Sequence, residues 1–156
     1  MLVMDHEPSP AFVRFSEQGE DEIDLTLAAL EIARDEYPSL DTEMVVGQLV
    51  TLTERAKVLS EGSENPIVQM RAINTCLFQE LGLSGNSRAY FDPRNSYLND
   101  VLERKVGIPI TLSVVYLDIG WRMGLPLVGV GFPGHFLVKC HIGDSVVVVD
   151  PFHRGL

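Results

Sequence analysis

The chain has 156 residues, of which 46% are hydrophobic and 22% are charged, and its formal net charge at pH 7 is −10. This length and composition fit one soluble globular domain with a sizeable hydrophobic core. The acidic balance disfavours a nucleic acid ligand, because an acidic surface repels phosphate backbones.

The negative charge is concentrated in the N-terminal part of the chain. Residues 1–64 carry 15 acidic and 4 basic side chains, whereas residues 65–156 carry 7 and 8. We interpret the acidic part as solvated helix faces, with a docking face for a basic partner as the alternative. No apolar run approaches the roughly 20 residues that cross a bilayer, and the first ten residues lack the pattern of a signal peptide. Since the chain also has only two cysteines, we expect a reduced, cytoplasmic protein without membrane contact.

The chain begins with a polar segment that contains proline, residues 1–20, which predicts an N-terminal arm. We expect residues 21–156 to form a single domain. Its first helix is predicted to begin at Asp21 and to end before Pro38. The residues at helical spacing in this segment are Ile23, Leu27, Leu30 and Arg34.

Two further helices are predicted over residues 41–59 and 65–83. Asp41 or Thr42 caps the first, and Asn65 followed by proline is typical of the start of the second, which Gly82 would end. Their inner faces are predicted to carry Val45, Leu49, Leu52, Ala56 and Leu59 in the first, and Met70, Ile73, Leu77 and Leu81 in the second.

After a stretch rich in turn residues, the pattern indicates a short helix over 96–105 and a strongly apolar helix within 107–124. The stripe of the apolar helix contains Leu112, Val115, Tyr116, Ile119 and Met123. The last third then changes period. Residues 127–132, 135–142 and 146–150 are short, β-branched and aromatic, which predicts three strands. Helices followed by strands predict an α+β domain, with a helical N-terminal half packed on a small antiparallel sheet.

His135 and Asp150 lie at the ends of two of these strands, which Gly143-Asp144 joins as a hairpin turn. A two-residue loop would place Asp150 opposite Leu137, with His135 as its diagonal neighbour on the same face. A carboxylate bonded to one imidazole nitrogen fixes the tautomer and leaves the other nitrogen to act as a base. The alternatives are a three-residue loop, which would separate the pair, and a purely structural His–Asp hydrogen bond.

Two stretches of the sequence carry a family resemblance, "NSYLNDVLERKVGIPITLSVVYLDIGWRMGLPLVGVGFPGHFLVKC" and "VVVDPF". Together with "LGLSGN" and "YFDPRN" upstream, they resemble the bacterial SirB-type branch of the transglutaminase-like superfamily. The resemblance extends from about residue 21 onward and implies a layout like that of cysteine proteinases.

In the superfamily, a cysteine starts the central helix, and a histidine and an aspartate follow on two adjacent strands. That cysteine stands after a Gly-x pair, and a Gly-x-Pro closes the helix. Residues 107–108 supply the first motif here and residues 124–126 the second, so the place of the cysteine falls on Pro109. His135 and Asp150 match the other two members of the triad.

Proline has no nucleophilic atom, although it suits the first turn of a helix, so thiol chemistry by the usual route is excluded. Thr111 and Ser113 lie within a turn of Pro109 and are the candidate substitutes, with His135 as base. The alternative is that Thr111 bonds to the backbone of the first turn and Ser113 packs in the helix. Of the cysteines, Cys140 would face away from His135 on the same strand, and Cys76 is predicted to be a buried thiol.

A metal ion is a further possibility, with His135, Asp150 and His153 as ligands and His141 as a spare. Because no compact motif such as His-Glu-x-x-His supports this reading, we expect no metal and no cofactor. For ligand binding, Arg94, Asn95, Asn99 and Phe132 are predicted to lie near the entrance of a cleft.

These observations predict a non-catalytic transglutaminase-like domain, a pseudoenzyme, that has a binding or regulatory role and a protein or peptide partner. The alternative is an atypical hydrolase or acyltransferase in which Ser113 or Thr111 acts with His135 and Asp150. A third possibility is a structural role in an assembly through the acidic helical half. The resemblance also implies chains that continue into further helices, so this chain is either truncated at its C-terminus or a form without the helical extension.

Overall fold

The computed structural model describes residue 13 and residues 24–156 of the chain. Three helices form the helical half, namely α2 (Leu25–Glu36), α3 (Thr42–Leu59) and α4 (Pro66–Asn74), and α4 continues into the π-helical turn η2 (Thr75–Glu80). The predicted arm over residues 1–20, apart from Val13, and the predicted start at Asp21 lie outside the described residues.

Each of these helices begins at a polar residue whose side chain accepts a hydrogen bond from the first turn. Asp24 accepts from the backbone of Leu27, Asp41 from that of Met44, and Asn65 from that of Ile67. A side-chain oxygen at this position satisfies a backbone N–H that has no partner within the helix. The predicted caps at Asp41 and Asn65 are therefore confirmed.

The inner face of α2 differs from the prediction. Thr26, Leu30 and Ala33 face the core, whereas Leu27 is 42% exposed. The reason is a polar anchor, because the Thr26 hydroxyl donates a 2.7 Å hydrogen bond to the buried Asp118 carboxylate of the central helix. Burying that threonine turns Leu27 toward solvent. The predicted faces of the next two helices are buried or partly buried.

A compact middle segment joins the helical half to the rest of the chain. It contains the short strand β1 (Ser84–Gly85), the 3₁₀ turn η3 (Pro93–Ser96), the helix α5 (Leu98–Arg104) and the short strand β2 (Val106–Gly107). The strands β1 and β2 pair in parallel.

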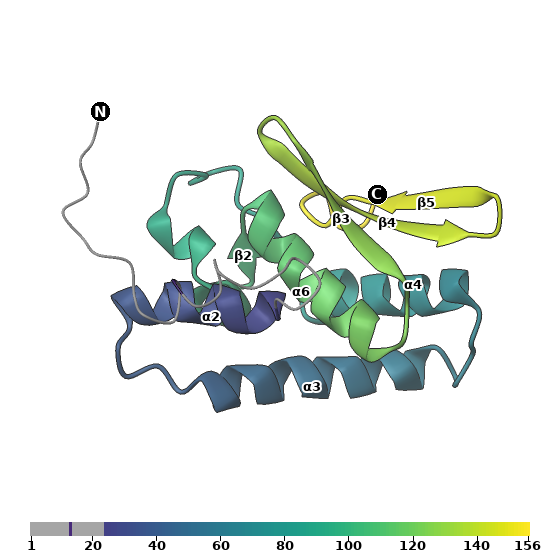
Figure 1. The fold of residues 1–156 in the computed structure, drawn as a ribbon, viewed down its shortest axis with the longest axis horizontal. Coiled ribbons are helices and arrows are strands. Elements are labelled where there is room, and N and C mark those ends of the chain that lie inside the picture. The colour runs from purple at the N-terminus through teal and green to yellow at the C-terminus, as the bar shows by residue number, and fades with distance from the viewer. Residues whose placement is uncertain (1–12, 14–23) are drawn as a thin grey trace.

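The helix α6 (Pro109–Arg122) is the centre of the fold. Pro109 and residues 111–120 are all buried, because α6 packs against α2, α3 and α4 and also against β3 (Leu127–Phe132) and β4 (His135–Ile142). Figure 1 shows α6 between the long helix α3 and the sheet. The sequence predicted an apolar stripe, but a helix covered from both sides is buried on more than that stripe.

The main sheet has three antiparallel strands in the order β3-β4-β5, with β5 spanning Ser145–Val149. Ile142 pairs with Ser145 and Val138 with Val149, so the loop at residues 143–144 has two residues, as predicted. The same register sets Asp150 opposite Leu137. The predicted α+β class is confirmed, and among the described residues no helix is both long and apolar enough to cross a membrane.

Candidate functional site

His135 is the first residue of β4 and follows a tight turn. Phe132 pairs with His135, so only Pro133 and Gly134 lie between β3 and β4, and Gly134 has a φ of +72°, which favours glycine. The Nε2 atom of His135 lies 2.8 Å from the Oδ2 atom of Asp150. The predicted pair therefore forms, and Nδ1 is the ring nitrogen left for another partner.

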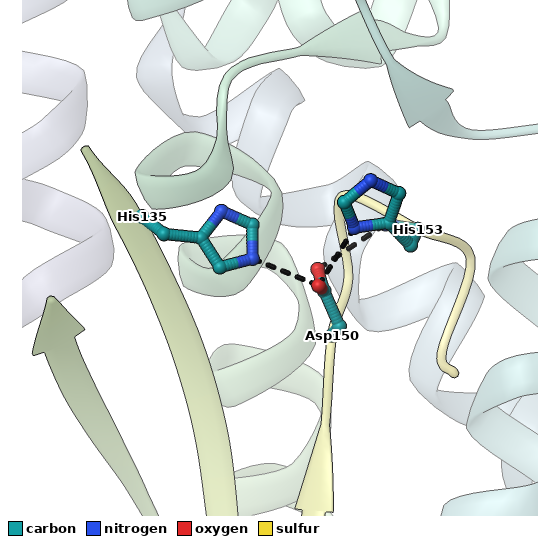
Figure 2. A group of neighbouring side chains, drawn as sticks. All are labelled: His135, Asp150 and His153. Carbon is teal, nitrogen blue, oxygen red and sulfur yellow. Dashed lines mark hydrogen bonds and ion pairs between the residues drawn. The ribbon is translucent and has the colours of Figure 1, made fainter.

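Asp150 follows β5 directly, and its carboxylate is the centre of a small hydrogen-bond network (Figure 2). Its Oδ1 accepts from the backbone N–H groups of Phe152 at 3.0 Å and His153 at 3.2 Å. Its Oδ2 is bonded to His135 and, at 2.7 Å, to Nδ1 of His153. Burial alone would raise the pKa of Asp150, but the hydrogen bonds from His153 and His135 outweigh it and the pKa is lowered. The carboxylate is therefore ionised at neutral pH.

The C-terminal turn, residues 150–156, holds Asp150 and His153 in place. The Gly155 N–H donates to the Asp150 carbonyl at 2.8 Å, and the Asp150 N–H donates to the Leu156 carbonyl at 3.0 Å. Two contacts fix the turn to the rest of the molecule: Asn74 of α4 donates to the Gly155 carbonyl, and the Gly85 N–H donates to the Phe152 carbonyl. The position of the carboxylate thus depends on α4 and β1.

A groove of about 160 Å³ opens beside His135. Tyr90 comes from the middle segment, Pro109 and Ile110 from the first turn of α6, and Phe136 from β4, and these side chains line it together with His135. The side chain of His135 is 28% exposed, so the ring forms part of an accessible wall. The lining combines aromatic and aliphatic surface with the polar ring of His135.

The order of these parts is a helix start, then a histidine, then an aspartate on neighbouring strands. The family model described as the transglutaminase-like superfamily matches residues 43–156, which is most of the chain and includes all of them. The chain belongs to the transglutaminase-like superfamily. The family expected from the sequence motifs is confirmed.

Three proteins with similar sequences show in which kinds of chain a domain like this one is found. A UPF0162 protein of Xylella fastidiosa (strain Temecula1) is 47% identical over 131 residues, which is 84% of this chain and 47% of the relative. A UPF0162 protein of Vibrio cholerae is 31% identical over 134 residues, covering 85% and 50%. The chain therefore spans about half the length of these curated relatives. F-box only protein 21 of Homo sapiens is 40% identical over 81 residues, 52% of this chain and 13% of that protein. No solved structure gives a significant match.

Pro109 stands at the first turn of α6 and lines the groove together with His135. The resemblance to the superfamily implies a cysteine at position 109, whereas proline offers neither a thiol nor a backbone N–H. The two cysteines do not replace it, because Cys76 is 1% and Cys140 is 0% exposed. Burial raises the pKa of the Cys76 thiol to about 11 and also raises that of Cys140, which disfavours a thiolate at neutral pH.

The hydroxyl groups of Thr111 and Ser113 bond to backbone groups. Thr111 donates to the Asn95 carbonyl at 2.8 Å, and its oxygen accepts from the Ile108 N–H at 3.2 Å, which closes the first turn of α6. Ser113 is fully buried, with its oxygen 3.5 Å from the Phe136 carbonyl. Among the described residues, neither hydroxyl is hydrogen-bonded to His135.

The four residues predicted to bind a ligand have different surroundings. Asn95 is fully buried, and its amide donates to the Ala89 and Tyr90 carbonyls, so it holds the loop that carries Tyr90. Arg94 is exposed and pairs with Asp92. Phe132 is 52% exposed at the turn before His135. The Oδ1 of Asn99 is buried without a hydrogen-bond partner among the described residues.

His153 joins the His135–Asp150 pair, whereas the sequence indicates it only as a candidate metal ligand. One nitrogen of each histidine and one oxygen of Asp150 all lie within 4.8 Å of one another, whereas His141 is not part of the group. The available signal was the spacing Asp-x-x-His directly after a strand. In a turn held by Asp150, that spacing brings the imidazole back to the carboxylate.

Proposed function

We propose that this transglutaminase-like domain is non-catalytic and binds a protein or peptide segment in the groove beside His135. The observation that carries the proposal is Pro109 in the groove wall, where a superfamily nucleophile would stand beside the imidazole. The acyl transfer expected of the superfamily needs a nucleophile within reach of that base. This domain has the groove and the oriented imidazole but has proline at the position of the nucleophile.

Peptide binding fits the lining and the rim of the groove. Tyr90 and Phe136 supply aromatic surface, and Nδ1 of His135 supplies a polar atom for a backbone amide or carbonyl. Phe91, next to Tyr90, is 94% exposed, and its ring packs edge-on against that of Tyr90. Exposed aromatic side chains around a concave site are typical of protein-binding surfaces.

The similarity to F-box only protein 21 supports a domain that can occur within different proteins, because a segment like this one forms 13% of that much longer chain. We also propose that the partner is not nucleic acid, since the net charge of −10 repels phosphate. We further propose a cytoplasmic location, for which the two free cysteines are the support.

The absence of catalysis is tested with covalent reagents on the purified chain. Iodoacetamide probes thiols and a fluorophosphonate probes activated hydroxyls. We expect slow labelling of Cys76 and Cys140 and no labelling of Thr111 or Ser113, with the same result in His135→Ala. Rapid labelling of any of these residues that disappears in His135→Ala would instead support the hydrolase or acyltransferase alternative.

Binding is tested by selecting a phage-displayed peptide library on the immobilised chain and measuring the affinity of the enriched peptides. The blocking variant is Ile110→Arg, which places a long charged side chain in the groove. Ile67→Arg is the matched control, because both isoleucines follow a proline at the first turn of a helix and are 40% and 41% exposed. We expect loss of affinity only in Ile110→Arg. Equal affinity in both variants would place the peptides elsewhere and contradict the proposal.

A further inference from the structure

Three potential metal ligands converge at the end of β5, beside the groove. Nε2 of His135 and Nδ1 of His153 lie 2.8 and 2.7 Å from the same oxygen, Oδ2 of Asp150. In Figure 2 the two rings approach the carboxylate from opposite sides, one from β4 and one from the C-terminal turn. Two separate parts of the chain, the head of β4 and the C-terminal turn, supply the group.

We propose that His135, Asp150 and His153 bind one divalent transition metal ion of the Zn²⁺ class. Two imidazole nitrogens and one carboxylate oxygen are a borderline donor set that suits such ions better than Mg²⁺ or Ca²⁺, which prefer oxygen. Zinc binds these donors at about 2.0–2.2 Å, which spaces the ligand atoms by about 3.4 Å in a tetrahedral site. The present group, in which all three atoms lie within 4.8 Å, reaches that spacing by small ring rotations.

The surroundings of the group fix the Asp150 carboxylate and leave the His153 ring free to rotate. Two backbone N–H groups bond to Oδ1 of Asp150, which orients Oδ2 toward the rings in the way that outer hydrogen bonds orient metal ligands. The side chain of His153 is 58% exposed, so this ring can rotate toward an incoming ion. The same exposure leaves the remaining coordination positions open to solvent.

Metal binding needs a change of tautomer and no redox step. In the metal-free form both ring nitrogens that face Asp150 carry a proton, since an ionised carboxylate only accepts. On binding, each neutral ring presents its lone pair to the metal and holds its proton on the other nitrogen. For His135 that nitrogen is Nδ1, which changes from an acceptor in the metal-free form to a donor toward the groove in the metal-bound form. The proposed metal ion and the proposed peptide therefore use different nitrogens of the same ring.

Equilibrium binding of Zn²⁺ to chelator-treated protein, measured by isothermal titration calorimetry, tests the proposal. We expect one ion per chain, and His153→Ala, which removes an exposed side chain, should weaken binding about tenfold or more. His141→Ala is the matched control, because His141 is also exposed and lies outside the group, and it should bind like the wild type. His6→Ala controls for the remaining histidine.

A second measurement keeps the test independent of folding changes. Co²⁺ titrated into the wild type should give the intense visible absorption of a four-coordinate N/O site, and this band should be absent in His153→Ala and unchanged in His141→Ala. Circular dichroism verifies that the variants are folded. The proposal is wrong if the wild type shows no saturable Zn²⁺ binding at submillimolar concentrations, or if His153→Ala binds as tightly as the wild type. Neither result would bear on peptide binding, which is measured with Ile110→Arg.

Discussion

His135 and Pro109 line the same groove, one at the head of β4 and the other at the first turn of α6. Nε2 of the imidazole is held by Asp150, which leaves Nδ1 as the ring nitrogen without this partner. Pro109 has no reactive atom.

The first prediction is that Pro109→Cys gives a reactive thiol. A cysteine at the first turn of α6 would lie near the positive end of the helix dipole and near His135, and both favour the thiolate. We expect iodoacetamide to modify it about tenfold faster or more than a cysteine with the unperturbed pKa of about 8.5. The measurement is mass spectrometry of labelled peptides over time, with Cys76 and Cys140 as internal references. The same labelling rate in Pro109→Cys combined with His135→Ala would show that the imidazole does not face position 109.

The second prediction concerns Asp150→Asn. The carboxylate accepts four hydrogen bonds, two from backbone N–H groups and two from imidazoles. An amide cannot accept them all, so we expect a loss of about 1–3 kcal/mol in the free energy of unfolding at pH 7. Urea denaturation of the two proteins measures the difference.

The stability difference between wild type and Asp150→Asn should also depend on pH. The folded pKa of Asp150 is lowered, so its stabilising contribution is present above the unfolded value of about 3.9 and is lost as pH falls through the folded pKa. The difference should therefore narrow below about pH 4. A difference that stays constant from pH 5 to pH 2.5 would contradict the role assigned to the charge.

The third prediction compares two glycines inside helices. In Gly47→Ala the added methyl group meets no atom within 4 Å, so the better helix propensity of alanine should stabilise the protein by about 0.5–1 kcal/mol. In Gly120→Ala of α6 the methyl group would overlap the Leu127 side chain, and we expect a loss of about 1–3 kcal/mol. Thermal melts of both variants decide this, and equal shifts in the same direction would contradict the close packing of α6 on β3.

The fourth prediction separates a buried polar contact from an exposed one. Thr26→Val removes the 2.7 Å hydrogen bond to Asp118, although Arg122 still bonds to that carboxylate. We expect a loss of about 1–2 kcal/mol. Glu31→Gln, which breaks the exposed pair with Arg34, should change stability by less than about 0.5 kcal/mol. If chemical denaturation gives similar values for both, the Thr26 contact does not orient α2.

The local rules of sequence predicted the parts of the fold that depend on neighbouring residues. The caps at Asp41 and Asn65 follow from the residue types that satisfy a free N–H. The register of the hairpin follows from the two-residue turn at 143–144, and with it the meeting of His135 and Asp150. In each case the partner lies close in sequence, or its position is set by one turn.

Features that depend on distant contacts were not predicted correctly. The exposure of Leu27 results from a bond between residues 26 and 118, and the burial of Asn95 depends on how the loop at residues 86–92 folds over it. The π-helical turn after α4 shows no periodicity that separates it from a continuous helix. The contact of His153 with Asp150 is different, because it joins residues three apart and the spacing Asp-x-x-His was its signal in the sequence.

The attachment of the C-terminal turn has a mechanical consequence. Asn74 and Gly155 are in such close contact that a methyl group on the glycine would lie 2.6 Å from the asparagine amide, and Phe152 packs equally tightly on Gly85. A distortion of α4 would therefore be transmitted through this clamp to the carboxylate, without any change to a groove residue. Substitutions in the helical half, far from the groove, can therefore change the position of Asp150 and, through it, the orientation of the His135 ring.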